Sequence, residues 1–137
     1  MPAVGWNGKF YGLGDGGFAG EVSYVHFAQA LSRGYAVAST DTGHKSGVTD
    51  ANWALGHPEK IIDFGNRAIH EMTVKAKTVV AAFYGEPARQ SYVASCSNEG
   101  RQALMEAQRY PDDYDGIIAG APAASWTRIM LNFTWNA

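Results

Sequence analysis

Short apolar runs with the character of β-strands alternate along this chain with longer segments that have helical spacing. Each strand-like run leads into a glycine-rich or polar loop. This alternation is typical of a mostly parallel sheet with covering helices, so we predict an α/β fold. The expected strands cover residues 10–13, 35–39, 92–94 and 117–119, and the expected helices cover residues 23–32, 62–83 and 98–110.

Apolar residues at three- and four-residue spacing predict which face of each helix packs on the sheet. Gly34 stands where a C-cap glycine belongs after the first helix, and Pro111 ends the third. The residues expected to face the core are Tyr24, Val25, Ala28 and Leu31 in the first helix, Ile69, Met72, Ala76, Val79, Val80 and Phe83 in the second, and Ala103, Leu104 and Ala107 in the third.

The size and composition indicate one globular domain with a real core. The chain has 137 residues, of which 46% are hydrophobic and 18% charged, as in globular rather than disordered proteins. The net charge is −2 and the charges are spread along the chain, so we expect no nucleic-acid partner. No apolar run approaches the roughly 20 residues of a membrane span, and no signal peptide is visible. We therefore expect no membrane partner.

The glycine-rich segment after the first expected strand has two interpretations. Gly12, Gly14 and Gly17 fit the G-x-G-x-x-G dinucleotide fingerprint, and Asp41 ends the next strand, where an acid would hold a ribose hydroxyl. That would indicate a dinucleotide-dependent oxidoreductase. Alternatively, residues 14–20 form a loop whose backbone N–H groups stabilise the oxyanion that develops during acyl transfer.

Ser97 lies where the third expected strand passes into the third expected helix. A serine on such a turn is how an α/β hydrolase presents its nucleophile, usually within G-x-S-x-G. Here Ser95 and Glu99 occupy the two glycine positions. The other interpretation is that Ser97 is an ordinary helix N-cap, and the spacing alone does not separate the two.

The remaining candidate residues give weaker signals. Cys96 is the single cysteine; it is either a buried free thiol or half of a disulfide whose partner lies outside this chain. His26 and His70 lie on expected helices, and we interpret them as structural or solvent-facing. His44 and His57 lie on the long loop 40–58 at the active-site edge and could line a pocket. No histidine spacing indicates a metal, so we expect no metal and no cofactor.

Four stretches together resemble the tannase/feruloyl esterase family of α/β hydrolases. They cover nearly the whole chain, and their combination is far more specific than any single glycine pattern. The four stretches are WNGKFYGLGDGGFAG (residues 6–20), GYAVASTDTGH (34–44), HPEKIIDFGNRAIHEMTVKAK (57–77) and SCSNEGRQALMEAQRYPDDYDGIIAGAPA (95–123).

The resemblance implies a serine carboxylesterase that cleaves aromatic esters of phenolic acids such as ferulate or gallate. It implies that Ser97 is the nucleophile and that the N–H of Asn98, with that of Gly16 or Gly17, forms the oxyanion hole. In this family the cysteine before the nucleophile pairs with a cysteine beside the catalytic histidine. Cys96 matches the first of these, which implies a secreted or periplasmic protein.

Family members are several times longer than this chain, and their catalytic acid, histidine and lid domain follow the region seen here. We therefore interpret residues 1–137 as the N-terminal part of one α/β-hydrolase domain, incomplete at its C-terminal side. The family pattern has glycine where Glu99 stands. A non-catalytic remnant is thus a second interpretation, and a half-sheet is expected to be marginally stable or to self-associate.

Overall fold

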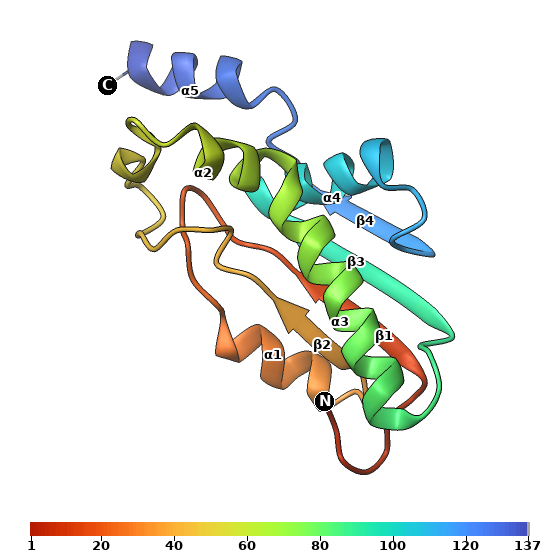
Figure 1. The fold of residues 1–137 in the computed structure, drawn as a ribbon. Helices are drawn as coiled ribbons and strands as arrows, with labels where there is room; N and C mark the ends of the chain where they lie inside the picture. Colours follow the sequence, from red (N-terminus) through yellow and green to blue (C-terminus); the bar gives the residue numbers. More distant parts are fainter. Residues whose placement is uncertain (137) are drawn as a thin grey trace.

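The computed structural model describes residues 1–136 and contains a four-stranded parallel sheet (Figure 1). The strands are β1 (Lys9–Leu13), β2 (Ala36–Ser39), β3 (Gln90–Cys96) and β4 (Gly116–Gly120), in the order β2-β1-β3-β4. The predicted α/β class is confirmed. Because all the strands are parallel, their carboxyl ends lie at one edge of the sheet, where Cys96 pairs with Gly120.

Helices cover the two faces of the sheet unequally. On one face, Phe10, Ala36 and Val93 form a core with Met72 and other residues of the helices α3 and α4. On the other face, Leu13 and Val37 pack against Phe27, Ala30 and Leu31 of α1 (Tyr24–Leu31). The helices are α1 (Tyr24–Leu31), α2 (Pro58–Ile62), α3 (Ala68–Tyr84), α4 (Asn98–Arg109) and α5 (Trp126–Trp135), with a short 3-10 turn η1 (Asn52–Ala54) and a π-helical turn η2 (Asp63–Arg67).

The predicted inward face of α1 is partly wrong: Leu31 packs on the sheet as expected, whereas Tyr24, Val25 and Ala28 are exposed. Tyr24 is 81% exposed and Val25 66% exposed, because the N-cap Ser23, whose Oγ accepts from the His26 N–H, leaves both in a first turn that turns outward. Phe27 and Ala30 pack on the sheet instead.

The predictions for the other two helices are partly wrong. On α3, Ile69 and Val80 are buried, whereas Val79 and Phe83 are exposed. On α4, Ala103 is buried as expected. However, Leu104 and Ala107 are exposed, because the buried face of α4 is made largely of polar side chains. Those polar residues are Asn98, Arg101, Gln102 and Glu106.

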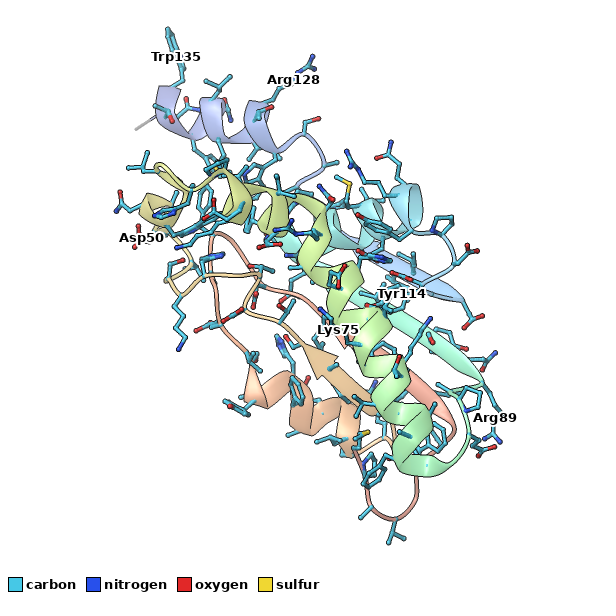
Figure 2. The ribbon with its side chains drawn as sticks, in the orientation of Figure 1. Asp50, Lys75, Arg89, Tyr114, Arg128 and Trp135 are labelled. Carbon is cyan, nitrogen blue, oxygen red and sulfur yellow. The ribbon has the colours of Figure 1, made fainter. Side chains whose placement is uncertain are left out.

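Two features were not predicted. The long helix does not run unbroken from residue 62, because η2 interrupts it before α3 begins. The helix α5 lies at the carboxyl edge of the sheet, and its last turn extends away from the body, with Trp135 pointing outward (Figure 2). No helix within residues 1–136 is long and apolar enough to span a bilayer.

The face of the sheet that carries α1 is only partly covered. Ala94 and Ile118 are neighbours in the register of β3 and β4 and lie on this face. Ile118 is 68% exposed, which is unusual for the central residue of a parallel strand, because such strands are normally covered on both faces.

Candidate active site

Ser97 has a backbone conformation that residues other than glycine rarely adopt. Its φ is 61° and its ψ −126°, at the single residue between β3 and α4. The N–H donates to Gly120 O at 3.1 Å, and the C=O accepts from the N–H groups of Arg101 at 3.1 Å and Ala123 at 3.0 Å. Such conformations persist only where the surroundings impose them, and they cluster at functional sites.

The side chain of Ser97 does not cap α4. It makes no capping hydrogen bond, and the residue is exposed at the carboxyl edge of the sheet. The N-cap interpretation therefore lacks the hydrogen bond that defines it. What remains is a serine hydroxyl held out of a sharp strand-to-helix turn, which is the arrangement of a nucleophile elbow.

The close contact between strand and helix at this turn falls on Gly100. A Cβ there would lie 2.6 Å from Gly120 O and 3.2 Å from the Cα of Pro122, so any larger residue would force α4 away from β4. Glu99, in the position where the family pattern has glycine, is half-buried, and its side chain lines a hollow on the face of the sheet that carries α1. Glu99 therefore does not crowd the elbow.

Glu99 lies at a hollow of about 410 Å³ on the face of the sheet that carries α1. The hollow is also lined by Tyr11, His26, Arg33 and Cys96. Burial raises the pKa of Glu99, while the charge of His26 and a hydrogen bond from the Cys96 backbone lower it. Cys96 is exposed, so the interpretation of it as a buried thiol is wrong.

The loop at residues 14–20 is held in place by the long loop that follows β2. Phe18 N donates to Val48 O at 2.9 Å, and Gly20 N donates to Ser46 O at 3.2 Å. Gly17 has φ 59°, and a Cβ there would overlap Val48 O. The carbonyl of Phe18 bonds to His44 Nε2 at 3.0 Å, and it also accepts from Ser46 Oγ and Trp53 Nε1.

Three backbone N–H groups at this edge are unused. Among residues 1–136, no hydrogen bond involves the N–H of Asn98, Gly16 or Gly17. A Cβ built on Gly16 would meet no atom within 4 Å, so that glycine borders open space. Unpaired N–H groups beside a serine hydroxyl are the donors that oxyanion stabilisation requires.

The dinucleotide interpretation of the three glycines is wrong. A Cβ on Gly12 would overlap the Tyr114 hydroxyl, and one on Gly14 would overlap Gln102 Oε1. The space beside these two glycines is filled by protein side chains, so they do not make room for a pyrophosphate. The next helix starts only at Tyr24, too far along to place its N-terminus against a phosphate.

None of the four histidines forms a hydrogen bond with Ser97 within the described residues. His44 is buried, stacked on Trp53 at 3.8 Å between ring centroids. His57 is exposed and pairs with Glu59, and His26 lies on α1. His70 bonds to Asp113 through Nδ1. Within residues 1–136, no histidine is therefore placed to act as a base on the Ser97 hydroxyl.

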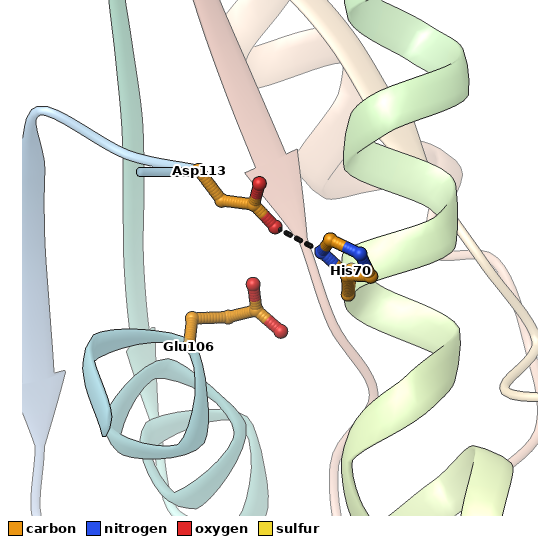
Figure 3. A group of neighbouring side chains, drawn as sticks. All are labelled: His70, Glu106 and Asp113. Carbon is orange, nitrogen blue, oxygen red and sulfur yellow. Dashed lines mark hydrogen bonds and ion pairs between the residues drawn. The ribbon is translucent and has the colours of Figure 1, made fainter. Parts of the chain in front are cut away.

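His70, Glu106 and Asp113 form a buried cluster that the sequence spacing did not suggest (Figure 3). They come from α3, α4 and the turn before β4, and His70 Nδ1 lies 2.7 Å from Asp113 Oδ2. Glu106 is fully buried, and neither of its oxygens receives a hydrogen bond from a donor. Burial and the Asp113 carboxylate raise the pKa of Glu106 to about 8, which favours the protonated form at neutral pH.

These three side chains are the set that could hold a cation, since their donor atoms lie within 4.8 Å of one another. However, ligands bound at about 2.1 Å to one ion are about 3 Å or more apart. His70 and Asp113 would have to separate to admit it. A proton on Glu106 supplies the donor that these two carboxyl groups otherwise lack, because a protonated carboxyl can donate to Asp113.

A parallel α/β sheet with a serine on a sharp turn between a strand and a helix is the arrangement of the α/β hydrolases. Residues 1–137 match the family described as tannase and feruloyl esterase. The chain belongs to this family.

Similar proteins agree with this membership. The chain is 40% identical over 136 residues to an uncharacterized esterase of Xanthomonas campestris pv. campestris, covering 99% of this chain and 24% of that protein. It is also 40% identical to a probable feruloyl esterase of Arthroderma benhamiae, covering 95% and 25% of the two. The crystal structure of feruloyl esterase B from Aspergillus oryzae superposes with a TM-score of 0.83 at 36% identity, over 88% of this chain and 24% of that chain. The chain thus spans about a quarter of the length of these relatives.

Sequence reasoning missed the polar residues that surround the turn. Arg101, Gln102 and Asp15 are buried, and burial raises the pKa of Asp15 to about 8, assisted by the nearby charges of Glu99 and Asp41. One signal was available: Asn98, Arg101 and Gln102 recur at three- and four-residue spacing and so lie on one face of α4.

Proposed function

We propose that Ser97 is the nucleophile of a carboxylic ester hydrolase that cleaves esters of aromatic, phenolic acids. Its Oγ attacks the ester carbonyl and forms an O–C bond, a base takes the hydroxyl proton, and the alcohol leaves with a proton. Water then attacks the acyl-enzyme and releases the acid. The observation that carries the proposal is the positive φ of Ser97, fixed from β4 and α4. The named feruloyl esterases among the relatives support the aromatic substrate.

A negative charge forms on the carbonyl oxygen during this reaction. We propose that the N–H of Asn98, together with that of Gly16 or Gly17, stabilises it. Each such donor contributes about 3 kcal/mol of transition-state stabilisation in enzymes that use one. The unused state of these three N–H groups supports the assignment.

The proposal needs a histidine and an acid from polypeptide beyond these 137 residues. Cys96 is exposed next to Ser97, and we propose that it pairs with a cysteine beside that histidine. Such a disulfide would hold the base near the nucleophile, and it requires an oxidising location, secreted or periplasmic.

A fluorophosphonate probe tests the proposal, because it forms a stable adduct only with an activated serine. We expect the adduct mass on the peptide that contains Ser97, and none in Ser97→Ala. Ser32→Ala removes another exposed serine and should label like the wild type. Aryl ester hydrolysis should follow the same order. A complete polypeptide that contains these residues together with the proposed histidine and acid, and that stays unlabelled, would refute the proposal.

A non-catalytic role is the second candidate, and the absence of a base bonded to Ser97 among the described residues favours it. Under this alternative the fold and the strained turn persist while no probe reacts.

The uncovered face around Ile118 also supports self-association of the isolated chain. Light scattering after size-exclusion chromatography would test this, since a stable monomer would contradict it.

A further inference from the structure

The backbone of Asp15, in the middle of the glycine-rich loop, is bonded on both sides by side chains of α4. Asn98 Nδ2 donates to Asp15 O at 2.8 Å, and Asp15 N donates to Gln102 Oε1 at 3.2 Å. All three residues are buried, and Asn98 is 0% exposed. Asp15 directly precedes Gly16, so these two bonds fix the loop next to its unused N–H groups.

The amide of Asn98 is itself held in one orientation. Arg101 Nε donates to Asn98 Oδ1 at 2.7 Å, which leaves the Nδ2 end of the amide to donate to the loop. The guanidinium of Arg101 also donates to Gly65 O and Phe64 O, both at 2.9 Å. These carbonyls belong to η2, where a π-turn shifts the regular helical hydrogen bonds.

The contact with Gln102 depends on the loop as well as on the helix. A Cβ on Gly14 would overlap Gln102 Oε1, so only glycine lets the amide reach the loop backbone. The Nε2 of Gln102 is buried without a partner, which carries an energetic cost. An apolar side chain would avoid that cost but could not accept the Asp15 N–H.

We propose that Asn98 and Gln102 are positioning residues, whose side chains hold the loop at residues 14–17 so that its free N–H and the N–H of Asn98 converge on one oxygen beside Ser97. The inference rests on the proposed function. It assigns the side chain of Asn98 a task separate from that of its backbone. A purely structural role would stabilise the fold without affecting how the loop N–H is aimed.

Two variants test this clamp, formed by the side chains of Asn98 and Gln102, in the complete polypeptide that contains these residues and the proposed histidine and acid. Asn98→Asp is isosteric and keeps an acceptor for Arg101 but cannot donate to Asp15 O when ionised. Gln102→Met keeps the length of the side chain but cannot accept from Asp15 N. Gln108→Met makes the same change at an exposed position of α4 and serves as the control.

Two readouts are compared across these variants. Hydrogen exchange in residues 14–20 should rise by tenfold or more in Asn98→Asp and Gln102→Met, with exchange in α3 unchanged. The maximal rate of Ser97 labelling by the fluorophosphonate should fall about 10- to 100-fold while its binding constant stays within twofold, because the phosphoryl oxygen meets the donors mainly in the transition state.

The outcomes separate this inference from the proposed function. Unchanged loop exchange and unchanged labelling in both folded variants would overturn the clamp. Slower labelling accompanied by faster hydrogen exchange throughout α3 would also overturn it, because that result indicates a general loss of stability. No labelling of the wild type would refute the proposed function, while loop exchange would still decide whether the two side chains hold the loop.

Discussion

The two ends of α4 both bury polar side chains, but they satisfy them differently. At the N-terminal end, Arg101 and Asn98 each donate to fixed carbonyl or amide oxygens. At the C-terminal end, Glu106 faces Asp113, and both are acceptors unless a proton is present. The end near Ser97 thus has bonds that do not depend on a titrating group, whereas the far end depends on pH.

This difference follows from the kind of donor at each end. Arg101 remains charged at neutral pH although burial lowers its pKa to about 10. Its partners are carbonyl and amide oxygens, which do not titrate. Glu106 lies beside the carboxylate of Asp113, which is in turn bonded to His70. The N-terminal end of α4, beside the candidate active site, is therefore held by hydrogen bonds that do not titrate. The C-terminal end, about two turns away, depends on a proton.

The largest expected effect comes from removing the hydrogen bonds that Arg101 donates at the N-terminal end of α4. Arg101→Met leaves Phe64 O, Gly65 O and Asn98 Oδ1 without their donor. Each buried acceptor left unpaired costs about 1 to 3 kcal/mol, so we expect a loss of about 3 to 5 kcal/mol in unfolding free energy. Urea denaturation measures it, with the exposed Arg109→Met as the control. Equal midpoints for the two variants would show that Arg101 does not hold this end.

The second prediction concerns the far end and its pH dependence. The pKa of Glu106 rises from 4.5 to about 8, so between these values the folded protein keeps a proton that the unfolded chain has lost. Stability from this group is fully present below about pH 4.5 and declines up to about pH 8, by at most about 1.4 kcal/mol per pH unit. The pKa of Asp15 is also raised, to about 8, so this group likewise makes the protein less stable as the pH rises.

Glu106→Gln removes one of these two titrations, because a neutral amide does not lose a proton. We expect the slope of unfolding free energy against pH to become shallower between pH 5 and 8, and the variant to be about 2 kcal/mol more stable than wild type at pH 8.5. Urea titrations at four pH values measure this. The exposed Glu86→Gln should keep the wild-type slope, and an unchanged slope in Glu106→Gln would contradict a buried proton at this site.

The sequence predicts the strands well because local signals define them. The apolar runs of β1 and β4 end at glycine, and both strands begin and end within two residues of their expected bounds. The turn at Ser97 was foreseen for the same reason, as a serine between a strand and a helix. A strained backbone was expected there only if Ser97 is a nucleophile, and the local sequence did not decide between this and an N-cap, because the hydrogen bonds with Gly120 and Ala123 that fix φ involve segments more than twenty residues away.

The buried polar face of α4 escaped prediction because its residues look like a solvent-facing stripe. Polar side chains at helical spacing normally face water, and only the π-turn carbonyls and the loop backbone make burial of Arg101 and Gln102 favourable. His70 and Asp113 are 43 residues apart, so only the packing of α3 beside α4 brings them together.

The smallest expected effect comes from replacing Glu99 at the N-terminal end of α4. Glu99→Gly places there the glycine of the family pattern, but Glu99 lies in the hollow beside His26 and does not crowd the turn. We expect Ser97 labelling within twofold of wild type, and stability lower by at most about 1 kcal/mol because glycine adds entropy to the unfolded chain. Gly100→Ala is the contrasting variant. Its Cβ would meet Gly120 O at 2.6 Å, and we expect that change to slow labelling at least tenfold. A large gain from Glu99→Gly would instead show that the glutamate, rather than the contact at Gly100, restricts the turn.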